Sequence, residues 1–201
     1  MSRGPSASIP DMLPDPPPVI QSPLPYELLL DERTRSWIDL VVIHCTELPD
    51  LAAARGFGER ALYDSGTGNS GHYYIDRDGS VHQYVRVERI AHHVRGYNRR
   101  AIGIELVNIG RYPDWLAAGN QSMHEAYTDE QIAALVDLLQ YLQREVPTLK
   151  FIAGHEELDT TEVPASDDES VLVHRKLDPG PLFPWDRVMQ KTNFERLRPD
   201  L

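Results

Sequence analysis

The chain has 201 residues, and its 41% hydrophobic and 25% charged residues are typical of one soluble globular domain with extensions. Its formal net charge of −11 disfavours nucleic acid and anionic membranes as partners, because both favour a basic surface patch. The single cysteine, Cys45, excludes an internal disulfide, and no apolar run reaches the ~18 residues of a membrane span.

The N-terminal stretch is rich in proline, which fixes φ and removes a backbone donor. Residues 1–25 are therefore expected to form an extended or disordered extension, and the compact domain to span 26–198. The first residues, "MSRGPSASIPDMLPDPPPV", lack the apolar segment of a secretory signal. The expected compartment is the cytoplasm, with the periplasm as the alternative if a signal has been removed.

Strand and helix patterns alternate along the remaining chain. "WIDLVVIHC" (37–45) predicts a buried strand, "LPDLAAARGFGERALY" a helix, and "HYYIDRDGSVHQYV" a hairpin that turns at Asp78-Gly79. His72 and His82 are expected at the surface of this hairpin. "AIGIELVNIG" predicts another central strand. This pattern favours an α/β fold with a mixed central β-sheet flanked by helices.

The C-terminal half continues the alternation. The segment 128–147 predicts an amphipathic helix, capped by Thr128 with Gln131 as the capping-box partner. "LKFIAGH" predicts a short strand, and the acidic "DTTEVPASDDES" (159–170) a solvated loop.

Three potential metal ligands lie at the ends of structured segments. His44 closes "DLVVIH", His155 closes "FIAGH", and Asp178 lies in the rigid segment "RKLDPGPLFPW". Two histidines and one carboxylate leave a tetrahedral position open for water, as in catalytic zinc sites. The alternative is that the histidines are ordinary strand-end residues and that Asp178 forms a turn before proline. The spacing matches no compact signature such as HExxH.

Glu105 interrupts the apolar run "AIGIELV". By strand alternation it shares a face with Gly103, which leaves room beside it for a ligand. A buried carboxylate in a central strand is costly unless it is paired or functional, and the alternative is an ion pair with an arginine at the sheet rim. Lys176, two residues before Asp178, could stabilise an oxyanion. The alternative for Lys176 is a solvated side chain.

Together these segments resemble the type-2 N-acetylmuramoyl-L-alanine amidases, which include peptidoglycan-recycling enzymes, phage lysozymes and peptidoglycan-recognition proteins. The matching pieces come in order over about residues 37–187: "VVIHCTE", "SGHYYIDRDGSVHQYV", "RIAHHVRGYN", "AIGIELVN", the helix at 128–145, "IAGHEEL" and "RKLDPGPLFPW". The resemblance implies a Zn²⁺ site at His44, His155 and Asp178, and catalytic roles for Glu105 and Lys176. It also implies substrate contacts by His93 and Asn98.

The activity implied by the resemblance is zinc-dependent hydrolysis of the amide between the lactyl group of N-acetylmuramic acid and L-alanine. Soluble anhydro-muropeptides of cell-wall recycling are the expected substrate. The alternatives are a lytic amidase that acts on intact peptidoglycan and a recognition module without catalysis. His92 departs from the family pattern, which usually has tryptophan there, and neither the proline-rich N-terminus nor the acidic 159–170 stretch has a family counterpart in this resemblance. The oligomeric state is left open.

Overall fold

The computed structural model describes residues 17–199. Its centre is a seven-stranded sheet with the order β1-β4-β3-β5-β2-β6-β9. The strands are β1 (Val19–Gln21), β2 (Leu40–Cys45), β3 (Tyr73–Ile75), β4 (Val81–Gln83), β5 (Ala101–Leu106), β6 (Phe151–Gly154) and β9 (Glu195–Arg196). The β3–β4 hairpin pairs antiparallel and the other neighbours pair parallel, so the predicted mixed sheet is confirmed.

The N-terminal boundary differs from the sequence-based expectation. β1 pairs with β4 at the sheet edge, so the folded domain begins before Tyr26, and residues 1–16 of the predicted extension lie outside the described residues. Leu24 and Tyr26 are buried. Prolines in this stretch flank the strand, and an edge strand can add to a sheet through its backbone alone.

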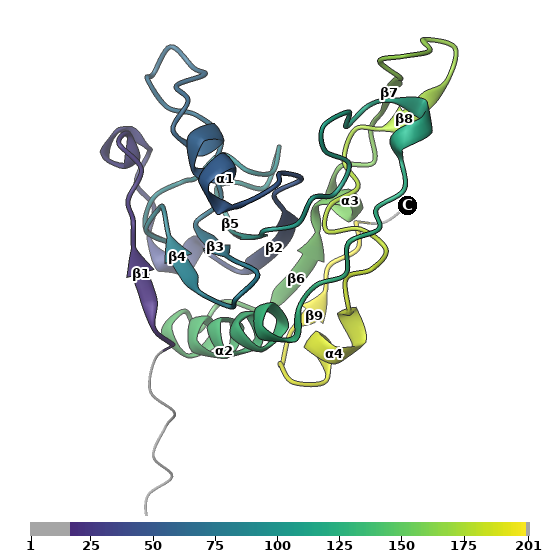
Figure 1. Ribbon diagram of the computed structural model, residues 1–201. Helices are drawn as coiled ribbons and strands as arrows, with labels where there is room; N and C mark the ends of the chain where they lie inside the picture. The colour runs from purple at the N-terminus through teal and green to yellow at the C-terminus, as the bar shows by residue number, and fades with distance from the viewer. Residues whose placement is uncertain (1–16, 200–201) are drawn as a thin grey trace, which may run out of the picture.

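The helices cover the sheet unequally. They are α1 (Leu51–Gly58), α2 (Asp129–Glu145), α3 (His155–Leu158) and α4 (Trp185–Met189), with 3₁₀ turns at Glu27–Leu29, Arg35–Trp37 and Ala118–Asn120. The long α2 lies along one face of the sheet, where its apolar stripe packs on Ile102, Ile104 and Leu106 (Figure 1). Its predicted capping box, Thr128 with Gln131, is present.

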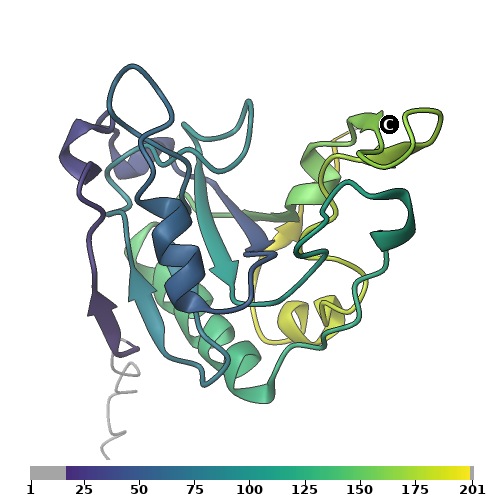
Figure 2. The same cartoon turned by 45° about the horizontal axis from the view of Figure 1, so that its top comes forward.

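The opposite face carries α1 and several loops (Figure 2). The acidic stretch expected to be a loop is instead part of a small antiparallel hairpin, β7 (Glu162–Pro164) with β8 (Leu172–His174), which projects from the body. Val163 pairs with Val173, whose side chain is buried, so a short apolar pair holds this arm together. None of the helices within 17–199 is both long and apolar enough to cross a membrane.

Candidate metal centre and active site

The three predicted ligands converge at the carboxyl ends of β2 and β6. His44 lies near the end of β2, His155 is the first residue of α3 directly after β6, and Asp178 follows β8. All three residues are buried, each at most 3% exposed. Parallel neighbours that end at one edge of a sheet bring distant parts of the chain to a common point, so the topology explains the convergence.

The ligand atoms face one another. Nδ1 of His44 lies 2.8 Å from Oδ2 of Asp178, and Nδ1 of His155 lies 3.1 Å from the same oxygen. One atom from each residue falls within 4.8 Å of the others. Asp178 Oδ1 is buried and has no hydrogen-bond partner among the described residues. Zinc–ligand bonds are about 2.0–2.2 Å long, so these three atoms are close enough to share one ion.

Their protonation states also suit a metal. Burial lowers the pKa of His44 to about 4, so its imidazole is neutral at neutral pH. Burial by itself would raise the pKa of Asp178, but the neighbouring rings of His155 and His44 and the Lys176 ammonium hold it well below its usual range. Neutral imidazole and ionised carboxylate are the forms that bind a metal.

The segment that carries Asp178 is anchored on both sides. The Asp178 carbonyl accepts a hydrogen bond from the Glu156 amide at 3.0 Å, and Tyr127 donates its hydroxyl proton to the Pro179 carbonyl at 2.7 Å. A Cβ atom at Gly154 would lie 2.9 Å from the Pro179 ring, so only glycine permits this close approach without displacement. The carboxylate is thereby held against α3 without belonging to a helix or strand.

Glu105 lies next to this group. β2 and β5 are in register at His44 and Glu105, which places the carboxylate beside the ligand on the cleft face of the sheet. A Cβ at Gly71 would lie 2.9 Å from Glu105 Cγ, so Gly71 makes room for the side chain. Burial raises the pKa of Glu105 well above its usual value, and nearby Asp178 adds to this, while Lys176 opposes it. The described residues offer Glu105 no arginine ion pair.

Gly103 has a different role from the one expected. A Cβ there would lie 2.6 Å from the His93 ring, so the space beside Glu105's strand is filled by His93 and not left for a ligand. His93 Nδ1 lies 2.9 Å from Nε2 of His44. Asn98 Oδ1 accepts hydrogen bonds from the backbone amides of His93 at 3.0 Å and Val94 at 2.7 Å, and so holds this loop. Both predicted substrate-contact residues line the cleft.

Two residues behind the site escaped sequence reasoning. His72, expected at the surface, is fully buried, and its Nδ1 accepts a hydrogen bond from the Gly103 amide at 3.0 Å. Arg33 Nη2 lies 2.8 Å from His72 Nε2. The same guanidinium donates to four carbonyls between positions 87 and 101, in the part of the chain that carries His93 and Asn98. No local signal marks either residue, since the partners of their side chains lie 17 to 68 positions away.

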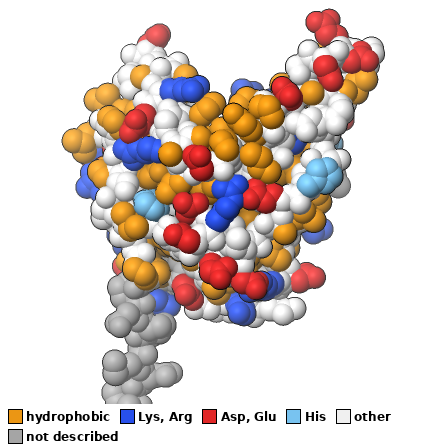
Figure 3. Space-filling view, in the orientation of Figure 1, with side chains coloured by type: hydrophobic (Ala, Val, Ile, Leu, Met, Phe, Trp, Pro, Cys, Tyr) orange, Lys and Arg blue, Asp and Glu red, His pale blue; other side chains and the backbone are white. Residues whose placement is uncertain are grey.

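These groups open into one cleft of about 780 Å³. Figure 3 shows the surface hollowed between the projection above α1 and the β7–β8 arm. Apolar side chains of Phe57, Tyr63, Trp115 and Leu116 line it together with Arg95, Arg175 and Lys176. The volume falls in the usual range for organic ligands, and the mixed lining suits a ligand with apolar and anionic parts.

Comparisons with known proteins agree with this arrangement. The family model described as N-acetylmuramoyl-L-alanine amidase matches residues 33–181. A curated protein of Haemophilus influenzae, described as uncharacterized, is 37% identical over 81 residues. That match covers 40% of this chain and 63% of the relative, so it spans less than two thirds of the relative's length.

Solved structures share the fold. The N-acetylmuramoyl-L-alanine amidase LysC from Clostridium intestinale URNW superposes with a TM-score of 0.63 at 18% identity, over 89% of this chain and 99% of that chain. The amidase AmiD from E. coli, solved with the substrate anhydro-N-acetylmuramic acid-L-Ala-D-gamma-Glu-L-Lys, has a TM-score of 0.58 at 23% identity. That match covers 77% of this chain and 57% of the other. The predicted fold is thereby confirmed.

Proposed function

This chain belongs to the N-acetylmuramoyl-L-alanine amidase family, and we propose that it hydrolyses the lactyl–L-alanine amide of muropeptides with the help of zinc. The observation that carries the proposal is the convergence of His44, His155 and Asp178 beside Glu105 in one cleft. A binding module needs no general base, so the buried carboxylate of Glu105 beside the three candidate ligands favours the enzyme over a recognition module.

The donor set fits zinc. His44, His155 and Asp178 would hold the ion through two imidazole nitrogens and one carboxylate oxygen, which leaves a position open. A zinc ion there would supply Lewis acidity, which polarises an amide carbonyl and eases the deprotonation of water.

Glu105 would carry the proton. Its carboxylate takes a proton from the attacking water as the oxygen adds to the amide carbon. It then passes that proton to the leaving nitrogen as the C–N bond breaks, which yields a lactyl carboxylate and a free L-alanine amine. Burial raises the pKa of Glu105, so its carboxylate takes up a proton more readily than an exposed glutamate does.

Lys176 would stabilise the charge that develops on the amide oxygen. Its side chain lines the same cleft as Glu105 and the ligands. Its ammonium lies near enough to oppose the rise that burial causes in the pKa of Glu105. It also adds to the effect of the His155 and His44 rings, which hold the pKa of Asp178 low. A fixed cation that faces a developing oxyanion lowers the barrier without any rearrangement during the reaction.

Soluble muropeptides are the proposed substrate, in cytoplasmic cell-wall recycling. The net charge of −11 gives no electrostatic help in adsorbing to an anionic polymer. Asp167, Asp168 and Glu169 lie between β7 and β8, where they add negative charge to the arm. A wall-acting amidase is the alternative outcome of the test.

The test is to incubate zinc-loaded protein with a soluble anhydro-muropeptide and, separately, with intact sacculi at equal muropeptide concentration. Mass spectrometry should find the free stem peptide and the anhydro-muramyl sugar, with faster release from the soluble substrate. Equal rates on sacculi would favour the wall-acting enzyme. Zinc binding without any cleavage of either substrate would favour the recognition module.

A further inference from the structure

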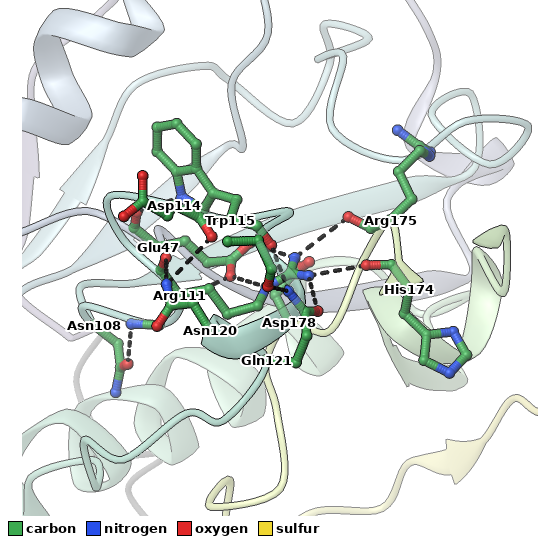
Figure 4. A network of polar contacts seen from close by, with 12 residues as sticks. Glu47, Asn108, Arg111, Asp114, Trp115, Asn120, Gln121, His174, Arg175 and Asp178 are labelled. Atoms are coloured by element: carbon green, nitrogen blue, oxygen red, sulfur yellow. Dashed lines mark hydrogen bonds and ion pairs between the residues drawn. The ribbon is translucent and has the colours of Figure 1, made fainter. Parts of the chain in front are cut away.

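A buried ion pair lies behind the cleft. Arg111 is 1% exposed and Glu47 is 7% exposed. Arg111 Nε lies 2.7 Å from Glu47 Oε1, and Arg111 Nη2 lies 3.1 Å from Oε2, so the two side chains form a bidentate ion pair (Figure 4). A pair this deeply buried gains little net stability over apolar residues of similar size, so stability alone does not account for it.

The remaining donors of Arg111 reach other segments. Nη1 donates to Gln121 Oε1 at 3.1 Å and to the His174 carbonyl at 2.9 Å, and Nη2 also donates to the Arg175 carbonyl at 3.3 Å (Figure 4). With the two bonds to Glu47, these contacts use all five N–H groups of the guanidinium. A lysine has three donors on one nitrogen and could not span the same set.

The contacts join three loops. Glu47 follows β2, Arg111 follows β5, and His174 ends β8. The first two loops approach closely, since a Cβ at Gly110 would lie 2.6 Å from Glu47 Cγ. Glu47 itself has a φ of 49°, in the left-handed region that side chains other than glycine rarely adopt. The loops therefore hold a costly local geometry that brings the carboxylate to Arg111.

The third loop, which follows β8, carries two of the candidate site residues. The two carbonyls that Arg111 holds belong to the residues directly before Lys176, and Asp178 follows two positions later. At its far side this segment is anchored to α3 and Tyr127, as described above. Arg111 is thus one anchor on the near side of Lys176, beside the hydrogen bond from the Arg175 amide to the Thr161 carbonyl and the ion pair of Arg175 with Asp159.

We propose that Arg111 is a positioning residue that sets the main chain before Lys176 and Asp178, with Glu47 as the buried counter-charge that holds its guanidinium in place. The proposal rests on the proposed amidase function for its kinetic consequence. Its structural consequence, order in the 174–178 segment and zinc affinity at Asp178, needs no substrate.

The chain offers a matched control. Arg77 also forms a bidentate ion pair, in which Nε lies 2.7 Å from Glu125 Oε1 and Nη2 lies 3.0 Å from Oε2. Its guanidinium also donates to the Pro49 carbonyl at 2.8 Å. This pair reaches the loop after β2 at Pro49 and, through Glu125, the loop after β5 at Ile109, but it makes no contact with residues 174–178. Arg77→Met thus removes the same kinds of bond as Arg111→Met without touching the Lys176 segment.

Four variants test the proposal: Arg111→Met, Arg111→Lys, Arg77→Met and the double variant Arg111→Met with Glu47→Gln. The double variant leaves no unpaired buried carboxylate, so it keeps the test valid if Arg111→Met alone fails to fold. Amide hydrogen exchange of residues 172–178, zinc Kd by competition with a chromophoric chelator, and kcat and KM on an anhydro-muropeptide are measured for each.

We expect faster exchange in 172–178 for each Arg111 variant, and zinc binding weakened about 10- to 100-fold. At saturating zinc, kcat should fall roughly 10- to 100-fold, because a small misplacement of a reacting group costs that much. Arg111→Lys should not restore it, and Arg77→Met, which leaves the bonds to the His174 and Arg175 carbonyls in place, should change all three readouts far less. Exchange and zinc affinity like those of wild type in a folded Arg111 variant would overturn the proposal. Wild-type protein inactive on every muropeptide would overturn the amidase function, while exchange and zinc affinity would still decide the positioning role.

Discussion

His93 Nδ1 lies 2.9 Å from Nε2 of His44, while Nδ1 of the same His44 ring faces Asp178 Oδ2 at 2.8 Å. A neutral imidazole has one N–H donor and one acceptor. If Nε2 of His44 donates to His93, Nδ1 is left with a free lone pair on the side of Asp178 and His155. In that tautomer, His93 would hold His44 in the orientation that it needs to bind a metal.

His93→Ala should weaken zinc binding about 10- to 100-fold, because His44 loses the acceptor that orients it. Competition with a chromophoric chelator measures this directly, without any substrate. His92→Ala is the neighbouring control, since His92 contacts Tyr63 and none of the three ligands. Equal zinc affinities for the His93 variant and wild type would show that His93 acts on the substrate alone.

Gly103→Ala should destabilise the fold and the site together. The added Cβ would lie 2.6 Å from the His93 ring, and overpacking of this kind typically costs about 1–3 kcal/mol. Urea unfolding gives the free energy change, and chelator competition gives zinc affinity, which should fall with the displaced ring. Gly56→Ala in α1 is the control, because nothing lies within 4 Å of its added Cβ. That change should raise stability by up to about 1 kcal/mol.

Glu105→Gln should retain the fold and the zinc site but lose most turnover. Proton transfer by a positioned carboxylate is typically worth about 10²–10⁴-fold, and the amide of glutamine cannot accept the proton from water. Rates on a soluble muropeptide, with zinc content measured on the same samples, check this. A variant that keeps more than about a tenth of the wild-type rate would contradict the role of general base.

Removal of the metal should lower stability as well as activity. Zinc that binds only the folded chain adds about 2.7 kcal/mol when its free concentration is 100 times its Kd. Thermal unfolding with zinc, and after treatment with a chelator, measures the difference. Asp178→Asn removes the charged ligand and should abolish most of the zinc-dependent shift. The same shift in wild type and Asp178→Asn would place the ion elsewhere.

Tyr26 should make the fold sensitive to alkali. Burial raises its pKa to about 12, and its hydroxyl donates to the Gly58 carbonyl at 2.6 Å. The neutral form is favoured in the folded state, so its contribution is complete below about pH 10, the value for an unfolded tyrosine. It should be lost as the pH rises from 10 towards 12. Urea unfolding at several pH values should show a shallower alkaline decline in Tyr26→Phe than in wild type.

The sequence predicts best those elements whose signals are local. The apolar stripe and capping box of α2 lie within one segment, and the Asp78-Gly79 turn fixes the β3–β4 hairpin. β1 has no such signal, because three residues join the sheet edge through backbone hydrogen bonds. The sequence does not predict the β7–β8 hairpin, because its acidic composition is typical of a loop and only the pair of Val163 and Val173 favours a strand.

The site shows the same division. Strand alternation places Glu105 on the cleft face, and the ligands come from segments with a recognisable order. What Gly103 accommodates could not be read from "AIGIELV", because His93 approaches from another loop. Arg33 and Arg111 act through partners far along the chain. The carbonyls to which Arg33 donates lie 54 to 68 positions away, and Glu47 lies 64 positions from Arg111. Such long-range hydrogen bonds leave no pattern in neighbouring residues.

The pairing of β2 with β5 fixes the spacing of two site residues through the backbone. His44 and Glu105 face each other across neighbouring strands, so the backbone ladder sets their spacing at the ~4.8 Å of any sheet. Insertions or deletions in the surrounding loops leave that spacing unchanged. The β7–β8 arm does contact other loops, since the Ser166 amide donates to the Leu116 carbonyl and the Ala118 amide to Asp167 Oδ1. Changes in the arm would therefore reshape the wall of the cleft, while His44 and Glu105 keep their spacing.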